Sequence, residues 1–325
     1  MKILVVGGAG YIGSHMLRRL QKTNYKVEVL DNLSTGYEEN TLGFLFHKCD
    51  LANKDQLNSI LQNNYDLVMH FASYINVGES YLYPQKYYEN NVNNTMNLLN
   101  CMVDQKILNF IFSSSAAVYG DPGPSPISEE ENINPVNPYG QTKAMVENIL
   151  KDYDRAYGLK STCLRYFNAC GAHLDGTIGE SHNPETHLIP LVLQAASGRK
   201  NSITVFGDDY TTKDGTCIRD YIHVMDLAEA HLLALDSLRS KQISNIYNIG
   251  NNIGFSVKEI IEIAEEVTQR KIKINIESRR KGDPAQLVAN NKKIKEELNW
   301  TAQYSDLKTI ISSAWQWEQK LLQSN

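Results

Sequence analysis

The chain has 325 residues, of which 42% are hydrophobic and 21% are charged, close to the averages of globular proteins. This composition excludes a disordered or collagen-like chain, and the length predicts about two domains, or one large α/β domain with an appended lobe. The formal net charge of −5 at pH 7 provides no basic excess for binding nucleic acid or an anionic membrane, so neither partner is expected.

Cysteine and histidine usage gives no sign of a metal site. The five cysteines are widely spaced, with no CxxC pair and no cysteine–histidine cluster of zinc-site spacing, so we expect a reduced, cytoplasmic chain without bound metal. The eight histidines are scattered along the sequence, which is typical of structural roles. The first apolar run, Ile3–Val6, is too short for a signal peptide, and no run approaches the roughly 18 residues of a membrane span.

Short apolar runs alternate with helix-period stretches in the first half of the chain. The amphipathic stretches include Ile12–Lys22 and Tyr88–Met102, and the expected strands are Ile3–Val6, Lys26–Leu30, Phe44–His47, Leu67–Phe71, Phe110–Phe112 and Cys163–Phe167. Apolar runs of this kind, separated by amphipathic helices, are typical of parallel strands covered on both faces. The sequence therefore predicts an α/β fold with a Rossmann-type, doubly wound parallel sheet.

The character of the sequence changes after Gly171. Residues 173–187 are polar and glycine-dotted, which favours a functional loop. A capping box, Ser256-Val257-Lys258-Glu259, predicts a helix that runs through Val267, and a last helix is expected at about 306–322. We therefore expect a first domain at residues 1–172 and a smaller mixed α/β domain at residues 173–325, with some later segments returning to the first.

A glycine-rich turn follows the first predicted strand and begins the first helix. Gly7, Gly10 and Gly13 would allow a tight turn, a close approach of a pyrophosphate, and close packing of helix on strand. Asp31 ends the second predicted strand, 18 residues beyond Gly13. A carboxylate there accepts hydrogen bonds from the adenosine ribose and repels a 2′-phosphate, so the pattern predicts NAD rather than NADP.

Two other polar positions have less specific interpretations. Asp50, after the third strand, would either bind the adenine amino group or cap a helix at residues 51–61. Asn90 lies in a predicted helix that asparagine disfavours, which suggests that its side chain is engaged elsewhere.

Tyr139 and Lys143 form a YxxxK pair, which places a phenol and an ammonium on one helix face. Tyrosine, with a pKa of about 10, is a poor base at neutral pH. A neighbouring ammonium and the positive nicotinamide of NAD⁺ would stabilise the phenolate and bring the pKa toward the working pH. Ser115, at the end of the predicted strand Phe110–Phe112 and its serine run, would bridge Tyr139 and a reacting hydroxyl.

Together these features resemble the extended short-chain dehydrogenase/reductases, and within that family the UDP-glucose 4-epimerase branch. The resemblance covers nearly the whole chain; its earlier segments are typical of the superfamily and its later ones of the epimerase branch. The segments that carry it are Gly7–His15, Asp31–Ser34, His70–Ala72, Val77–Ser80, Phe112–Ser115, Pro138–Gly140, Leu164–Asn168, Arg219–Val224 and Arg279–Asp283.

The resemblance implies an isomerase that interconverts UDP-glucose and UDP-galactose. Tightly held NAD⁺ would take a hydride from C4 of the sugar while Tyr139 takes the proton of the 4-hydroxyl. The 4-keto sugar would then turn over and receive the hydride on its other face. Ser115 and Tyr139 would contact the sugar, Lys143 would hold the nicotinamide ribose, and the family is expected to form homodimers.

The resemblance also implies two sets of binding residues. The cofactor set comprises Gly7, Gly10, Tyr11, Ile12, Gly13, Asp31, Asn32, Ser34, Thr35, Gly36, Asp50, Leu51, Phe71, Ala72, Ser73, Asn90, Ser113, Tyr139, Lys143 and Phe167. The substrate set comprises Ser115, Tyr139, Asn168, His187, Leu188, Thr204, Phe206, Arg219, Arg280, Asp283 and Leu287. Because a UDP-sugar brings about two negative charges to an acidic chain, Arg219 and Arg280 are expected to bind the diphosphate; the alternative is that they form surface ion pairs.

The sequence departs from its relatives at three positions. His187 stands where many relatives carry asparagine, and Ile75 replaces a lysine found near the cofactor in some of them. Leu287 fills a position where tyrosine excludes a 2-acetamido group. The smaller side chain predicts that UDP-N-acetylglucosamine and UDP-N-acetylgalactosamine are also accepted.

Three other functions are alternatives. A nucleotide-sugar 4,6-dehydratase would need an acid/base pair where this chain has Ala116 and Ala117, and a UDP-glucuronate epimerase would need a partner for the sugar carboxylate that the sequence does not reveal. A non-catalytic NAD-binding regulator would have no use for Ser115, Tyr139 and Lys143 beside the nicotinamide.

Overall fold

The computed structural model describes residues 1–123, 126–280 and 283–324. The chain divides into two compact units. The first unit consists of Met1–Gly120, Asn132–Tyr166 and Ala228–Tyr247, and the second of Asp121–Glu131, Phe167–Leu227 and Asn248–Asn325. Each unit therefore contains chain from both sides of residue 172.

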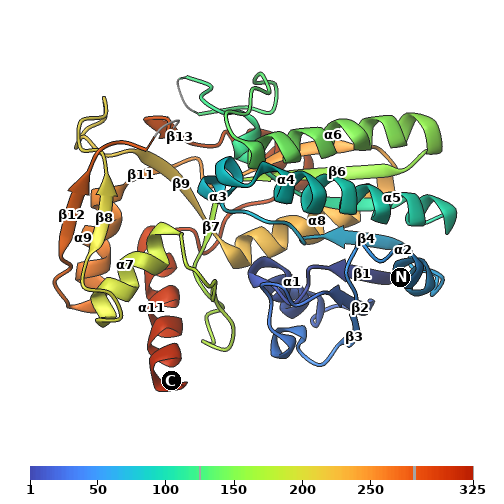
Figure 1. The fold of residues 1–325 in the computed structure, drawn as a ribbon, viewed down its shortest axis with the longest axis horizontal. Helices are drawn as coiled ribbons and strands as arrows, with labels where there is room; N and C mark the ends of the chain where they lie inside the picture. Colours follow the sequence, from blue (N-terminus) through green and yellow to red (C-terminus); the bar gives the residue numbers. More distant parts are fainter. Residues whose placement is uncertain (124–125, 281–282, 325) are drawn as a thin grey trace. The chain divides into compact units, whose positions relative to one another are not determined.

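A seven-stranded sheet forms the centre of the first unit (Figure 1), with the strand order β10-β6-β5-β4-β1-β2-β3. The neighbouring pairs from β3 through β6 are all parallel. This order and direction confirm the predicted doubly wound fold. The strands are β1 (Lys2–Val6), β2 (Lys26–Asp31), β3 (Leu45–Lys48), β4 (Leu67–His70), β5 (Asn109–Ser115), β6 (Lys160–Tyr166) and β10 (Asn245–Ile249).

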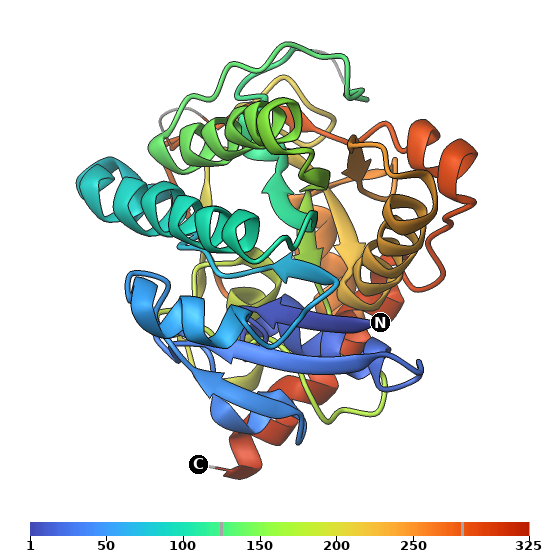
Figure 2. The ribbon, with the colours of Figure 1, turned by 90° about the vertical axis from the view of Figure 1, so that its right-hand side faces the viewer.

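Helices cover both faces of this sheet, as Figure 2 shows. Buried leucines of α2 (Lys54–Leu61) and α5 (Asn94–Asp104), with Val146 and Leu150 of α6 (Pro138–Tyr157), share one core with Leu4 and Val6 of β1. On the other face α1 (Tyr11–Leu20) and α8 (Val224–Lys241) are joined by an ion pair of 2.5 Å between Arg19 and Glu229. Strands buried on both faces explain why their sequences lack a polar–apolar alternation.

Two helix starts differ from the sequence expectation. The stretch predicted as one helix at 88–102 is a π-helical turn, Tyr88–Asn93, followed by α5. Within that turn the Asn91 amide donates to the Tyr74 carbonyl oxygen at 3.0 Å and to Thr142 Oγ1 at 3.1 Å, so its side chain is engaged outside the helix. The cap of α2 is Asn53, whose side chain accepts from the Gln56 N–H, so the interpretation of Asp50 as a cap is wrong.

Three helices and short strands of the second unit form a smaller hydrophobic core. Apolar residues of α7 (Leu188–Ser197), α9 (Val257–Thr268) and α11 (Leu307–Ser324) pack together with those of β8 (Ile203–Phe206) and β9 (Ile218–His223). Both predicted helices are confirmed, and the Ser256–Glu259 capping box makes both of its hydrogen bonds. The remaining elements are α3 (Val77–Leu82) and α4 (Pro84–Tyr87) of the first unit, and β7 (Asn168–Cys170), β11 (Gly254–Ser256), β12 (Ile274–Glu277), β13 (Gln286–Leu287) and α10 (Lys292–Leu298) of the second.

Among the described residues, no helix combines the length and apolar composition that crossing a bilayer requires.

Candidate active site

The glycine turn lies where the strand order of the first unit reverses, between β1 and β4. Gly7 has a φ of +79°, and a Cβ placed on it would lie 2.3 Å from the backbone nitrogen of Ala72, just after β4. A Cβ on Gly13 would lie 2.2 Å from the Gly7 carbonyl oxygen, whereas one on Gly10 would meet nothing closer than 3.5 Å. Gly7 and Gly13 are thus required for packing, and Gly10 leaves room beside the helix N-terminus, as a dinucleotide pyrophosphate needs.

Asp31 organises the next loop. Its carboxylate accepts hydrogen bonds from the backbone N–H groups of Ala9, at 3.0 Å, and Leu33, at 2.9 Å, and so joins the glycine turn to the end of β2. Burial raises the pKa of Asp31, and the two N–H donors offset part of that shift. A Cβ on Gly36 would lie 2.8 Å from Ala9, so this loop also packs against the turn. Of the predicted loop residues, Ser34 donates its N–H to Asn32 Oδ1 at 2.9 Å.

Other predicted cofactor residues follow β3 and β4, lie in the π-helical turn Tyr88–Asn93, or fall in the second unit. Asp50 accepts from the Asn32 amide at 2.8 Å, which brings the ends of β2 and β3 together. The Phe71 N–H donates to the Val6 carbonyl oxygen at 2.7 Å. The chain that continues through Ala72 and Ser73 therefore runs beside the glycine turn. Asn90 donates to Asn91 Oδ1 at 2.9 Å. Phe167 falls in the second unit, directly after β6.

The Ser115 hydroxyl lies close enough to the Tyr139 phenol to lower its pKa. Ser115 ends β5, and its Oγ also accepts from the Ala117 N–H at 3.1 Å. Tyr139 lies in the first turn of α6, after Pro138 at the first helical position and an Asn137 side chain that accepts from the Gly140 N–H at 2.7 Å. These local signals start α6 at the position that brings the phenol to the end of β5.

Lys143 is buried one turn further along α6. Its ammonium donates to the Ser113 carbonyl oxygen at 2.7 Å and lies 5.8 Å from the centroid of the Tyr139 ring. Burial lowers the pKa of Lys143 to about 7, although nearby Glu147 raises it. Burial also raises the pKa of Tyr139, and the Ser115 hydrogen bond reverses only part of this shift. The lowered tyrosine pKa that the sequence predicts is therefore not a property of the chain alone, because burial outweighs the effect of Ser115.

A buried ion pair behind Lys143 was not foreseen from the sequence. Glu147, on the next turn of α6, accepts from Arg165 Nη2 at 2.6 Å and from Ser114 Oγ at 2.5 Å. Arg165 Nη1 donates to the Tyr119 hydroxyl at 2.8 Å. Both charged side chains are only 3% exposed. The signals in the sequence were an arginine inside an apolar strand and a glutamate four residues after Lys143.

In the second unit, several predicted substrate residues gather around β9. Arg219 lies beside Leu287 in the pairing of β9 with β13, and its guanidinium is 3.7 Å from the Asp283 carboxylate. The Asn168 amide donates to the backbone oxygen of Asp220 at 2.8 Å. The Asp220 carboxylate is fully buried and accepts from the N–H groups of Asn251, Asn252 and Ala289, which fixes the loops at this edge.

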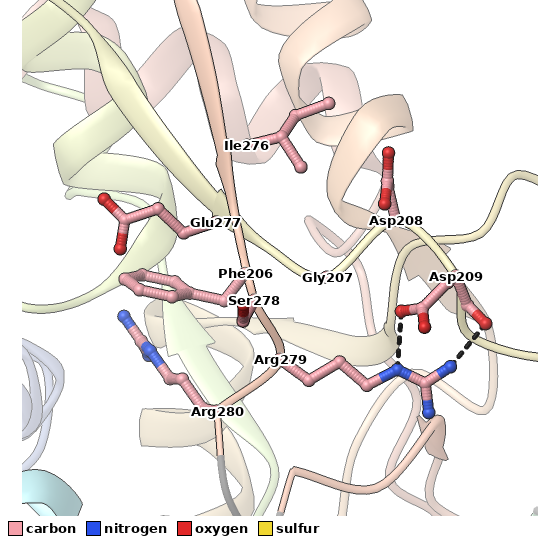
Figure 3. Close-up of a pocket in the computed structure, with 9 residues that line it drawn as sticks. All are labelled: Phe206, Gly207, Asp208, Asp209, Ile276, Glu277, Ser278, Arg279 and Arg280. Atoms are coloured by element: carbon pink, nitrogen blue, oxygen red, sulfur yellow. Dashed lines mark hydrogen bonds and ion pairs between the residues drawn. The ribbon is translucent and has the colours of Figure 1, made fainter.

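Phe206 and Arg280 line an open groove of about 840 Å³ in the same unit (Figure 3). The Arg280 guanidinium lies 3.9 Å above the Phe206 ring, whereas Arg279 turns away and pairs with Asp209 at 2.6 Å. Thr204 lies two residues before Phe206 on β8 and therefore shares its strand face. Lys281 and Gly282 of the resembling segment lie outside the described residues.

Two of the histidines that we expected to be scattered, His182 and His187, lie together before α7. His187, the residue before that helix, is 2.8 Å from Glu180 and 2.9 Å from Glu185 through its Nδ1 atom. His182 Nδ1 is 3.0 Å from the same Glu180. Burial alone would lower the pKa of each imidazole, but the two carboxylates outweigh it and raise the pKa of His182 to about 9 and of His187 to about 10. Leu188 begins α7 directly after this cluster.

Comparison with known proteins agrees with this geometry. The family model of the NAD-dependent epimerase/dehydratase family matches residues 3–250. The chain belongs to this family. It is 47% identical to the UDP-glucose 4-epimerase of Halalkalibacterium halodurans over 98% of this chain and 96% of the relative.

Solved structures of other epimerases have the same fold. The UDP-glucose 4-epimerase of Brucella ovis in complex with NAD superposes with a TM-score of 0.94, at 46% identity and 97% coverage of both chains. The UDP-Glc/GlcNAc 4-epimerase of Campylobacter jejuni superposes with a TM-score of 0.86, at 43% identity, covering 98% of this chain and 99% of that one. Membership of an NAD-dependent family fits the glycine turn and Asp31, which are suited to a dinucleotide.

The ion pair behind Lys143 gives the first prediction. Replacing Arg165 with methionine leaves the buried Glu147 carboxylate without its partner, which costs about 3–5 kcal/mol in the free energy of unfolding. Denaturant unfolding of Arg165→Met should show that loss, whereas Arg155→Met, which removes an exposed ion pair to Asp152, should change stability by less than about 1 kcal/mol. Equal stability of both variants would contradict the assigned role of Arg165.

Proposed function

We propose that the chain catalyses the reversible 4-epimerisation of UDP-glucose and UDP-galactose with bound NAD. The observation that carries the proposal is the Tyr139 phenol beside the Ser115 hydroxyl, with the buried ammonium of Lys143 5.8 Å from the centroid of the phenol ring. A serine, a tyrosine and a lysine in this arrangement provide a proton acceptor for a sugar hydroxyl. The names of the relatives supply the substrate class, since both the Halalkalibacterium and the Brucella proteins are called UDP-glucose 4-epimerase.

NAD, when bound, supplies the hydride acceptor and donor for C4 of the sugar. Tyr139 accepts the proton of the 4-hydroxyl and later returns a proton to the same oxygen. Because the hydride would also return to C4, the sugar undergoes no net oxidation. Ser115, which lies beside Tyr139, orients that hydroxyl toward the phenol. Lys143 holds the nicotinamide ribose and contributes its charge to the phenolate.

Ionisation of Tyr139 depends on positive charge that the buried phenol lacks on its own. Its pKa is raised in the chain alone, so the phenolate needs both a protonated Lys143 and the charge of the oxidised cofactor. The base would therefore form mainly when the cofactor is present in its oxidised form. This restriction suits an enzyme whose proton and hydride transfers must occur together.

The diphosphate requires local cations because the whole chain carries a net charge of −5. Arg280, stacked on Phe206 beside the open groove, and Arg219, on β9, are assigned this task. The 3.7 Å separation of Arg219 from Asp283 is looser than a hydrogen-bonded ion pair, so Arg219 retains donors for an anion. Asn168, His187, Leu188, Thr204 and Asp283 complete the proposed substrate set.

Epimerisation is favoured over dehydration at the same position in the fold. Ala116 and Ala117 follow Ser115 in a short 3-10 turn, Ala116–Val118, so their methyl groups supply no acid or base for removing water from the sugar.

The same resemblance suggests how the protein is assembled. We propose a cytoplasmic homodimer that uses helices of the first unit. In support, Leu82 and the following Tyr83, at the end of α3, are 73% and 61% exposed, which is unusual for neighbouring large apolar side chains.

Substitution of the phenol tests the reaction. Tyr139→Phe should lower the rate of UDP-galactose conversion by at least about 100-fold, because it removes the proton acceptor, while the NAD content of the purified protein is unchanged. The assay follows product formation without added nucleotide.

Tyr153→Phe is the matched control, since Tyr153 lies on the same helix and bonds to Asn100 rather than to Ser115. It should retain the native rate. Retention of most activity by Tyr139→Phe would assign the base to another residue.

We also propose that N-acetylated UDP-hexoses are substrates. Leu287 replaces a larger tyrosine of some relatives, and the Campylobacter protein, 43% identical, is named a UDP-Glc/GlcNAc 4-epimerase. Leu287 lies beside Arg219 in the β9–β13 pair, so its side chain is next to a proposed diphosphate ligand.

Leu287→Tyr should reduce turnover of UDP-N-acetylglucosamine by at least about tenfold and leave UDP-glucose turnover nearly unchanged, because only the acetamido group needs the space. The comparison requires kcat/KM on both sugars. Gln286→Tyr is the control, since neighbouring residues of a strand point to opposite faces. No acetamido turnover by the native chain would refute the proposal.

A further inference from the structure

Four side chains between β7 and α7 converge on one point. Glu180, His182, Glu185 and His187 each offer one nitrogen or oxygen atom, and these four atoms lie within 4.8 Å of one another. The spacing E-x-H-x-x-E-x-H places them within eight residues of a single loop. Of these four residues only His187 belongs to the proposed substrate set, so the proposed reaction does not explain why all four side chains converge.

Four separations between histidine nitrogens and carboxylate oxygens in this cluster, from 2.8 to 3.7 Å, lie on either side of the edge length of a metal-ligand tetrahedron, and the four converging atoms lie within 4.8 Å of one another. Zinc bonds of about 2.0–2.1 Å to imidazole nitrogen and carboxylate oxygen place neighbouring ligand atoms about 3.3 Å apart in tetrahedral geometry. The Nδ1 atom of His187 is 2.8 Å from Glu180 and 2.9 Å from Glu185, and that of His182 is 3.0 Å and 3.7 Å from the same two carboxylates. Modest adjustment therefore brings all four donors around one ion.

Charge and burial favour a divalent cation at this point. The Glu180 and Glu185 side chains are both only 5% exposed, so two carboxylates are largely removed from water close together. Buried carboxylates need a compensating charge of +2 in the same place. One divalent ion supplies that charge while both imidazoles remain neutral; without metal, two protons on the imidazoles must supply it.

We propose that this loop binds one divalent transition metal, with zinc as the best match. Two imidazoles and two carboxylates suit zinc, whereas calcium and magnesium require six or more oxygen ligands. All four donors come from the protein, so the site is structural and holds no activated water. The ion would join the loop to the start of α7, because His187 is the residue that precedes that helix.

Zinc binding to the NAD-bound protein, after removal of metal with a chelator, tests the proposal. Equilibrium dialysis should show one zinc per chain. Cobalt, used as a probe in place of zinc, should give the intense visible absorption of tetrahedral nitrogen and oxygen coordination. The protein should also unfold at a higher temperature with zinc than without it.

Two variants identify the ligands. His182→Ala, outside the proposed catalytic and substrate sets, should weaken zinc binding by at least about 100-fold. Such a loss exceeds the usual effect of removing a residue that only hydrogen-bonds to a metal ligand. Glu180→Gln should do the same, and unchanged NAD content shows that each variant is folded. His47→Ala is the control, because His47 also lies 2.8 Å from a carboxylate, that of Glu28, and should bind zinc normally.

Three results would overturn the proposal. The first is an absence of zinc binding by the native protein at micromolar zinc concentrations. The cluster would then consist of ion pairs between protonated histidines and carboxylates. The second is a near-ultraviolet thiolate band with cobalt, which would assign the metal to one of the five free cysteines. The third is zinc binding by His182→Ala and Glu180→Gln with the native affinity.

Discussion

The proposed active site depends on a phenol and an ammonium that α6 buries one turn apart against the end of β5. Burial disfavours the charged form of both groups: it raises the pKa of Tyr139 and lowers that of Lys143. The fold counters this tendency at Lys143 with the Ser113 carbonyl oxygen and the Glu147 carboxylate. At Tyr139 only Ser115 opposes the effect of burial among the causes of the pKa shift, so in the proposed mechanism the phenol ionises in response to the cofactor.

The scaffold explains how these groups are held in place. Asn137 and Pro138 begin α6, and Arg165 of β6 anchors Glu147 on the same helix. The same sheet presents the glycine turn at the switch between β1 and β4, where parallel α/β sheets bind dinucleotides. The proposed proton transfer and cofactor binding therefore depend on one set of parallel strands.

The features that could be predicted from the sequence are those that depend on residues close together in the chain. The strands, the helices around Tyr139 and Ser256, and the glycine turn follow from periodicity and capping residues close in the chain. The Arg165–Glu147 pair was missed because its partners are 18 residues apart and on different elements. The histidine–glutamate cluster was missed because its spacing differs from that of cysteine–histidine metal sites. The π-helical turn at Tyr88–Asn93 was missed because periodicity cannot detect one inserted residue.

The pH dependence of kcat/KM in Lys143→Met tests most directly whether the ammonium sustains the phenolate. The variant is compared with the native protein at saturating NAD, with rates divided by bound NAD. The reaction needs ionised Tyr139, and loss of a neighbouring cation raises a phenol pKa, so the acid limb of the profile should move to higher pH by more than one unit. An acid limb at the same pH in both proteins would contradict the account.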